Sequence, residues 1–153
     1  MDEQVNHLIN DKKINLNITT PRGLKFEEKA DMIIMRCVDG DLGALPGHEL
    51  VSVVLGDGIM RIYNDGIEKK LAVFGGIAEI GAKTVNVFST IAQHPEEIDL
   101  KRAEADRQRF EATIREESEE KQIHSLHVLL RRSLVRIEAS LEMDSSDEYE
   151  DND

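Results

Sequence analysis

The chain has 153 residues, of which 40% are apolar and only 4% aromatic, and its formal net charge at pH 7 is −12. This length suits one domain, or a small domain with an appendage, whose core must be built from Val, Ile, Leu and Ala. The negative charge argues against a broad nucleic-acid-binding surface, because too few cations are present to neutralise the phosphates.

The sequence also bears on the compartment. No apolar run approaches the roughly 18 residues of a transmembrane helix, and residues 1–10 are acidic and lack the apolar core of a signal peptide. Cys37 is the only cysteine, so no intrachain disulfide can form and a reducing compartment is expected. Because Cys37 stands in the run "MIIMRCVD", which predicts a strand, we expect a buried thiol.

Residues 1–93 are predicted to form an all-β domain. They contain all ten glycines, which separate short runs rich in Val, Ile and Thr such as "DMIIMRCVDG", "LVSVVLGDG" and "KTVNVFST". Runs of this kind at intervals of about ten residues are typical of a β sandwich or barrel. The "NDG" at residues 64–66 predicts a hairpin, since Asn and Gly accept positive φ angles.

Residues 94–142 are predicted to form a helical hairpin. Neither Gly nor Pro follows Pro95 in this segment, and a proline before acidic residues is a favourable helix start. We expect helices over 96–118 and 122–142, separated by the polar stretch "EESEEKQ".

The two predicted helices carry apolar stripes of different strength. The first has a thin stripe of mostly small residues, namely Ile98, Ala105, Phe110, Ala112 and Ile114. The second has a regular stripe at spacings of three and four, namely Leu126, Leu130, Leu134, Ile137 and Leu141. Because alanine contacts bury little apolar area, the hairpin should be held weakly, on the β domain or by a partner. The acidic residues 143–153 are expected to form a disordered tail.

The stretch "GDLGALPGH", residues 40–48, holds three glycines and a proline. A phosphate-binding P-loop requires a Lys and a Ser or Thr after its last glycine, and then a helix. Here His48, Glu49 and a strand-like run follow, which argues against that motif. Two interpretations stay open: a pair of tight turns in which Pro46 fixes φ, and an exposed corner shaped to meet a partner protein.

The sequence shows no recognisable catalytic constellation or metal site. His124 and His127 are three residues apart on a predicted helix, but no acidic ligand is clearly paired with them, so ordinary surface histidines are the better interpretation. No "GxSxG" motif occurs, and no carboxylate stands in an apolar setting that would raise its pKa for acid–base work. We therefore predict a chain without catalytic residues.

The predicted helices carry a constellation of arginines. Asp99, Arg102 and Arg109 share one face of the first helix. Arg132 and Arg136 are four residues apart on the second helix and lie nearly opposite its leucine stripe, so we expect them to point away from its apolar contact. Arginines from two adjacent helices could clamp an anionic phosphate bidentately. The alternative is that they are solvated or paired with nearby glutamates.

Three stretches carry a family resemblance: "DGDLGALPGHELVSVVLGDG", "FGGIAEI" and "VNVFSTIAQHPEEIDLKRAEADRQRF". In order, they give the long glycine loop, then Gly75 and Gly76 with Glu79 three residues later, then a strand, and then Ile-Asp-x-x-Arg-Ala. The order and spacing of these motifs over residues 13–142 resemble the epsilon subunit of F-type ATP synthases. The long loop is the most specific of them.

The resemblance implies a fold and a role. Members of this family have a ten-stranded β sandwich followed by an antiparallel two-helix hairpin, and they are noncatalytic rotor subunits of the central stalk. The β domain would contact the gamma subunit and the c-ring, as a peripheral part of the complex on the cytoplasmic face of the bacterial membrane. The corner turned towards these partners would comprise Asp41, Leu42, Pro46, Gly47 and His48. The hairpin, when extended, would reach into the alpha/beta catalytic hexamer and block ATP hydrolysis.

The resemblance also implies a nucleotide site, although no cofactor is required. Some bacterial members bind ATP as a regulatory ligand in the folded hairpin, through Ile-Asp-x-x-Arg-Ala and later arginines. The matching residues here are Ile98, Asp99, Arg102, Ala103, Arg109, Arg132 and Arg136. The chain departs from the family at Gln93, near the place where a glutamate often stands. Two rival interpretations are a stand-alone nucleotide-sensing module and a small enzyme on a β sandwich.

Overall fold

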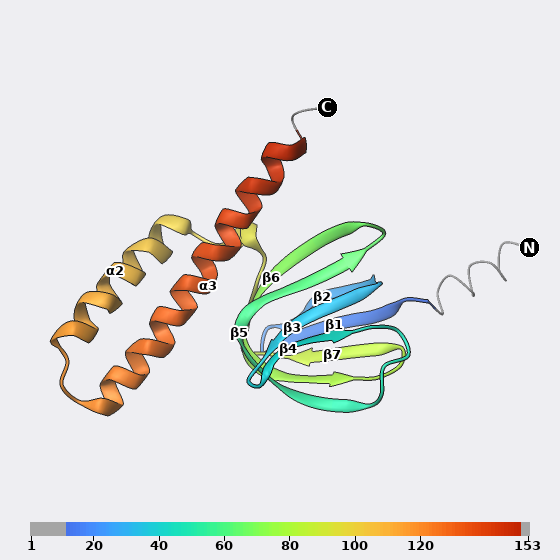
Figure 1. The fold of residues 1–153 in the computed structure, drawn as a ribbon, viewed down its shortest axis with the longest axis horizontal. Coiled ribbons are helices and arrows are strands. Elements are labelled where there is room, and N and C mark those ends of the chain that lie inside the picture. The colour runs from blue at the N-terminus through green and yellow to red at the C-terminus, as the bar shows by residue number, and fades with distance from the viewer. Residues whose placement is uncertain (1–11, 151–153) are drawn as a thin grey trace, which may run out of the picture. The chain divides into compact units, whose positions relative to one another are not determined.

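The structure, a computed structural model, describes residues 12–150. The chain divides between Ala92 and Gln93 into two compact units, a β unit and a helical unit, which are drawn in Figure 1. This division lies one residue before the boundary expected from the composition. None of the described helices is long and apolar enough to cross a membrane.

The β unit is a folded sheet, as predicted. Its strands are β1 (Ile14–Thr20), β2 (Gly23–Ala30), β3 (Met32–Cys37), β4 (Gly40–Ala44), β5 (Val51–Asn64), β6 (Ile67–Ile80), β7 (Thr84–Phe88) and β8 (Ile91–Gln93). They follow the order β2-β1-β7-β6-β5-β3-β4, and β8 pairs with β6. Strands β1 and β7 run parallel, whereas the other neighbours along this path are antiparallel. The prediction of an N-terminal β sandwich is confirmed.

The structure has eight strands among the described residues where ten were predicted, because β5 and β6 are each 14 residues long. The two strands pair from Val51 with Ile80 to Asn64 with Ile67, and the pairing is interrupted between them only where Gly56 faces Gly75. Gly75 and Gly76 have φ angles of 64° and 113°, which glycine adopts at little cost. The strands therefore bend at this point, and Figure 1 shows the β5–β6 pair curving between layers. Each of these long strands therefore counts once where the ten-strand prediction implies two shorter strands.

The core of the β unit is aliphatic, in agreement with the low aromatic content. Ile14, Leu16 and Ile18 of β1 are fully buried and alternate with asparagines, so one face of this strand is wet and the other dry. Cys37 is buried as well, which confirms the expectation of a buried thiol. Burial, and then the carboxylates of Asp41 and Asp39, raise the pKa of the Cys37 thiol.

The helical unit differs from the prediction at both ends. Residues Pro95–Glu97 form a short 3-10 turn, η1, and helix α2 spans Leu100–Glu116. The predicted start at residue 96 is wrong because Asp99, and not the proline, caps the α-helix. Helix α3 spans Glu120–Glu150 and enters the segment 143–153 that was expected to be a disordered tail. No Gly or Pro stands there to stop it; residues 151–153 lie outside the described part.

The predicted packing faces of the two helices are also partly wrong. On α2, Ala103 is buried, whereas the predicted stripe residues Ala105 and Ala112 are exposed. On α3, Leu134 and Leu141 are exposed, and the buried side chains within residues 120–142 are Ser133, Val135, Ala139 and Ser140. The contact between α2 and α3 therefore runs along faces rotated from the predicted stripes. Arg132 and Arg136 are both half-buried, and Arg136 lines a hollow together with residues of α2, so Arg136 does not point away from the contact as was expected.

Lys13, whose side chain is largely buried, connects three parts of the β unit. The Nζ atom of Lys13, just before β1, lies 2.7 Å from Asp31 Oδ1 and 2.7 Å from Asp65 Oδ1. It also donates to Asn64 Oδ1 at 2.6 Å, and the Asp65 N–H donates to Asp31 Oδ2 at 2.8 Å. The lysine thus joins the start of β1 to the β2–β3 junction and to the β5–β6 turn.

Replacing Lys13 by Met is expected to lower the melting temperature by several degrees at neutral pH, with little effect in acid. The bonds from Lys13 and then from the Asp65 N–H lower the pKa of Asp31. The stabilisation from Asp31 is therefore present above its unfolded pKa of about 3.9 and lost as the pH falls below it. Bonds to Asp31 and Asp65 raise the pKa of Lys13, so its contribution is complete below pH ~10.

Thermal melts between pH 2.5 and 9 would check this, with Lys12→Met as the control that removes the same charge from an exposed neighbour. A melting-temperature difference for Lys13→Met that persisted unchanged at pH ~2.5, where carboxylates are protonated, would contradict the role of the carboxylates.

Candidate functional site

The helical unit contains a hollow of about 260 Å³ near the start of α2. It is formed where η1, the N-terminal turns of α2 and the second half of α3 meet. Its lining comprises Gln93, Glu97, Ile98, Asp99, Arg102, Ala103, Asp106 and Arg136. The structure therefore brings five of the seven predicted nucleotide-binding residues together, from segments more than thirty positions apart in the chain.

The local sequence explains the shape of this hollow. Asp99 has extended backbone angles, and its Oδ1 accepts the Arg102 N–H at 3.1 Å, which caps α2. The Glu97 Oε2 accepts the His94 N–H at 2.9 Å and closes the preceding 3-10 turn. Ile98 lies extended between the two turns. The hollow thus lies beside the N-terminal end of α2, where the Asp99 carboxylate already accepts the Arg102 N–H.

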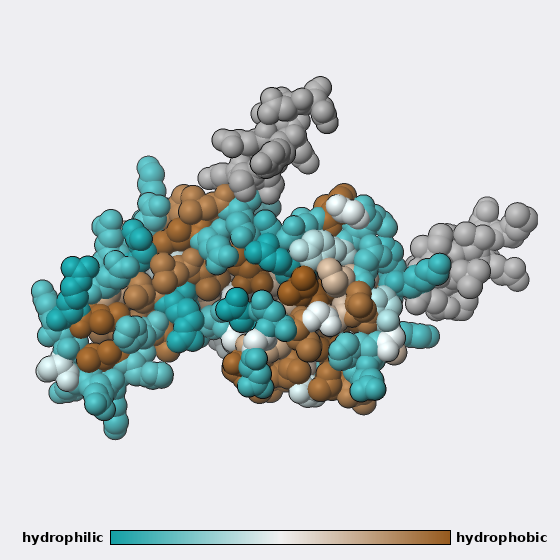
Figure 2. All heavy atoms as spheres, in the orientation of Figure 1, coloured by the Kyte–Doolittle hydropathy of each residue, from teal (hydrophilic) through white to brown (hydrophobic). Residues whose placement is uncertain are grey.

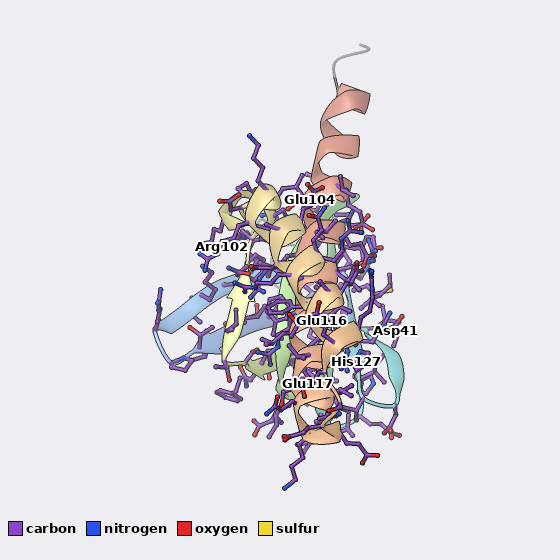
Figure 3. All side chains as sticks on the ribbon, turned by 90° about the vertical axis from the view of Figure 1, so that its left-hand side faces the viewer. Asp41, Arg102, Glu104, Glu116, Glu117 and His127 are labelled. Atoms are coloured by element: carbon purple, nitrogen blue, oxygen red, sulfur yellow. The ribbon has the colours of Figure 1, made fainter. Side chains whose placement is uncertain are left out.

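The two arginines of the hollow are held differently. Arg136 is half-buried, and its Nε donates to Gln93 Oε1 at 2.9 Å. Arg102 is exposed, and no ion pair joins its guanidinium to another of residues 12–142. Figure 3 shows Arg102 at the side of α2. One guanidinium is thus fixed by a neutral amide, and the other is available for a ligand.

The remaining two predicted arginines lie outside the hollow. Arg109 Nη2 is 3.3 Å from Asp106 Oδ1, and its guanidinium carbon stands 4.9 Å from the centre of the Phe110 ring. Arg132 is half-buried one helical turn before Arg136 but does not line the hollow.

Two acidic lining residues escaped the sequence reasoning. Asp106 follows Arg102 by four residues, so helical spacing places both on one face. In a chain with 33% charged residues, that spacing alone did not single it out. Glu97 belongs to the turn before the helix and follows no helical period.

The glycine-rich corner of the β unit contains a hydrogen-bonded turn. Leu45 to His48 form a tight turn closed by the His48 N–H donating to the Leu45 carbonyl at 3.1 Å. Gly47 has a φ of 87°, so a residue with a side chain would be strained there. Strand β5 follows at Val51, and no helix does, which agrees with the exclusion of a P-loop.

The predicted corner residues differ in exposure. Asp41 is exposed and pairs with Arg36, with 2.6 Å between Oδ1 and Nε. Leu42 packs against the core. His48 is half-buried, and its Nδ1 lies 2.6 Å from the Glu49 carbonyl oxygen. The large apolar side chains that the corner exposes are Leu45 and Leu50, neither of which was singled out from the sequence.

A second surface of the β unit was missed altogether. Val54, Ile77 and Phe88 stand directly opposite one another on β5, β6 and β7, and each side chain is about half exposed, at 55%, 49% and 49%. We call these three residues the apolar row. Opposed residues share one face of a sheet, so the row crosses three strands on the outer face. Figure 2 shows apolar surface exposed on the β unit.

The sequence did contain a signal for the row. In "TVNVF" the outward positions are Thr84, Asn86 and Phe88, so the aromatic residue stands on the polar side of the alternation. A single exposed apolar residue is ordinary, whereas apolar residues that adjoin one another on a wet face mark a contact surface. Within the described part of the chain, no cluster of side chains suited to hold a metal ion accompanies either surface.

Comparison with known proteins agrees with this architecture. Residues 13–95, more than half of the chain, match the family model of the ATP synthase delta/epsilon chain β-sandwich domain. The ATP synthase epsilon chain of Bacillus subtilis (strain 168) is 34% identical over 84% of this chain and 98% of its own length. That of Caldicellulosiruptor saccharolyticus is 30% identical over 82% of this chain and 91% of its own length.

A solved structure extends the similarity to the fold. A chain of the Euglena gracilis mitochondrial ATP synthase matches 85% of this chain and 82% of its own length, with a TM-score of 0.74 and 24% identity. The resemblance inferred from the glycine loop and the Ile-Asp-x-x-Arg-Ala motif is thereby confirmed. The chain belongs to the ATP synthase epsilon-chain family.

Proposed function

We propose that this chain is a noncatalytic rotor subunit of an F-type ATP synthase, joining the gamma subunit to the c-ring. The observation that carries the proposal is the apolar row, together with family membership over residues 13–95. Three apolar side chains in register on a wet sheet face are costly to leave in water, and a partner protein would cover them. The complex would hold the chain at the cytoplasmic face of the membrane, and its relatives are named as ATP synthase chains.

The two surfaces of the β unit suit two partners. The apolar row offers a flat strand face, which fits the gamma subunit. The turn at residues 45–48 exposes the Leu45 side chain, and Leu50, two residues after the turn, is 89% exposed. This corner fits the loops of the c-ring. A rigid sheet between the two would transmit rotation without chemistry of its own.

The helical unit acts in this proposal as a brake on ATP hydrolysis. Leu129, Leu134 and Leu141 of α3 are each more than two-fifths exposed, so the folded hairpin leaves much of its apolar stripe unburied. Because these side chains are already in contact with water in the folded hairpin, separating the two helices costs little free energy. Opened, α3 would present those leucines and Arg131, Arg132 and Arg136 to the acidic alpha/beta catalytic hexamer.

Deleting residues 96–153 is expected to raise ATP hydrolysis by the assembled synthase several-fold, because the element that enters the hexamer is gone. Hydrolysis by the purified complex, at equal subunit content, measures this. A chain truncated after residue 142 is the matched control, since it keeps both packed faces of the hairpin. Equal rates for the full-length and the 96–153-deleted complexes would contradict the brake.

ATP is proposed to bind the hollow of the helical unit and to favour the closed hairpin, because the hollow exists only while α2 and α3 are packed together. The guanidinium groups of Arg102 and Arg136 would hold the phosphates. A chain that binds ATP but never recovers gamma from an intact synthase preparation would instead be a stand-alone nucleotide sensor.

Changing Arg102 to Ala is expected to weaken ATP binding to the isolated chain about tenfold, the effect of losing one charge-assisted bond of roughly 1.5–3 kcal/mol. Isothermal calorimetry measures it. Lys101→Ala removes the same charge from an exposed neighbour outside the hollow and is the control. The absence of ATP heat for the unmodified chain would remove the nucleotide site.

A further inference from the structure

We propose that Asp106 sets the strength of nucleotide binding in the hollow by holding Arg109 away from the bound phosphates. This inference rests on the proposed ATP site and deepens it. Asp106 is not part of the motif that predicted the site, and its role follows from its contacts in the structure.

Asp106 is placed to compete with a ligand. It lines the hollow one helical turn after Arg102, and its side chain is only 28% exposed. Its Oδ1 is 3.3 Å from Arg109 Nη2, and the Arg109 side chain is 67% exposed over the Phe110 ring. The carboxylate therefore faces the ligand space on one side and an arginine on the other.

Asp106 differs from the other two carboxylates of the hollow. Asp99 caps α2 and Glu97 caps the 3-10 turn, so both accept backbone N–H groups and build the site. Within residues 12–142, Asp106 accepts no backbone N–H, and its hydrogen bond comes from the Arg109 side chain. It adds negative charge where phosphate would bind without contributing to the shape of the hollow.

The Asp106 carboxylate makes the net charge of the groups that line the hollow negative. Glu97, Asp99 and Asp106 line the hollow together with Arg102 and Arg136, so acidic groups outnumber basic ones by one. Removing the charge of Asp106 would equalise them. It would also release Arg109, whose exposed pair with Asp106 is weak, to turn towards a polyphosphate. Each change favours a highly charged nucleotide.

The test is ATP affinity by calorimetry for the full chain and for Asp106→Asn, which keeps the shape of the side chain. We expect Asp106→Asn to bind ATP about fivefold more tightly, the scale of one released, partly exposed ion pair and one removed repulsion. AMP affinity should change less, because one phosphate gains less from a second arginine. The control is Glu104→Gln, an equal charge change at an exposed residue outside the hollow. In Figure 3 the Glu104 and Arg102 side chains lie on different sides of α2.

Arg109→Ala and the Asp106→Asn/Arg109→Ala double variant complete a cycle. If Asp106 acts through Arg109, the gain from Asp106→Asn becomes smaller in the Arg109→Ala background, where only the removed repulsion between Asp106 and phosphate remains, and this outcome supports the inference. An equal gain in both backgrounds, or an affinity of Asp106→Asn no better than that of Glu104→Gln, overturns it while ATP binding by the unmodified chain upholds the site. No ATP binding by any variant, each with an unchanged circular-dichroism melt, overturns the inference and the ATP site together.

Discussion

Changing Gly76 to Ala is expected to destabilise the β unit by about 3–5 kcal/mol, the sum of backbone strain and overpacking. A Cβ atom at this position would overlap the Phe88 carbonyl oxygen and stand 2.9 Å from Ser89 Cα. The backbone φ of 113° is strained for any residue with a side chain. Ser89 is buried, with its hydroxyl 3.1 Å from the Phe74 and Ile91 carbonyl oxygens, so the neighbouring backbone has little freedom to move aside.

Urea unfolding of the full chain would measure the effect. Gly43→Ala is the matched control: Gly43 also lies in a strand, but a Cβ there would meet no atom within 4 Å and its φ is not positive. We expect that control to be close to neutral. A Gly76→Ala chain as stable as Gly43→Ala would show that β6 and the β7–β8 connection separate easily, which would argue against a rigid sheet between two partners.

The β unit was largely predictable because each strand carries its own local signal. Alternation along β1 and β7, the Asn-Asp-Gly turn at residues 64–66 and the positive-φ glycines are properties of short segments. The strand count was not predictable in the same way. Whether β5 is one strand or two depends on how the chain bends at Gly56 and Gly75, which is a matter of pairing over long separations.

The helical unit was harder because its faces are set by packing between helices. Ala105 and Ala112 fit an apolar stripe by spacing, yet Ala103, Phe110 and Ile114 lie on the face that is at least partly buried. Alanine contributes so little burial that its spacing does not decide the face. Asp99, which caps the helix, lay within the recognised motif. That the α-helix begins after Asp99 and not after Pro95 is seen only from the backbone angles.

The two candidate sites show the same contrast. Residues of the Ile-Asp-x-x-Arg-Ala motif are local and were placed together at the start of α2. Arg109 shares their helical face, yet it pairs with Asp106 and does not line the hollow. The apolar row is assembled from three strands, and only the register shows that Val54, Ile77 and Phe88 stand side by side.

Changing Ile77 to Glu is expected to weaken binding of the gamma subunit at least ~100-fold, equivalent to about 2.7 kcal/mol. Ile77 is the middle of the apolar row, with Val54 on one side and Phe88 on the other. Covering an isoleucine side chain contributes about 1.5–3 kcal/mol. The substitution loses that burial and also places an unpaired carboxylate in the contact. Because the side chain faces solvent in the free chain, folding should be little affected.

Titration of immobilised gamma subunit with the full chain measures the affinity, and a thermal melt confirms the fold. Leu24→Glu is the matched control: Leu24, which is 58% exposed against 49% for Ile77, is an apolar residue on β2, at the far end of the strand order. If Leu24→Glu binds gamma normally and Ile77→Glu does not, the apolar row is the docking face. If the two variants bind gamma equally well, the row is not covered by gamma. The rotor contact would then be sought at residues 40–50, where variants of Leu45 and Leu50 should show the loss.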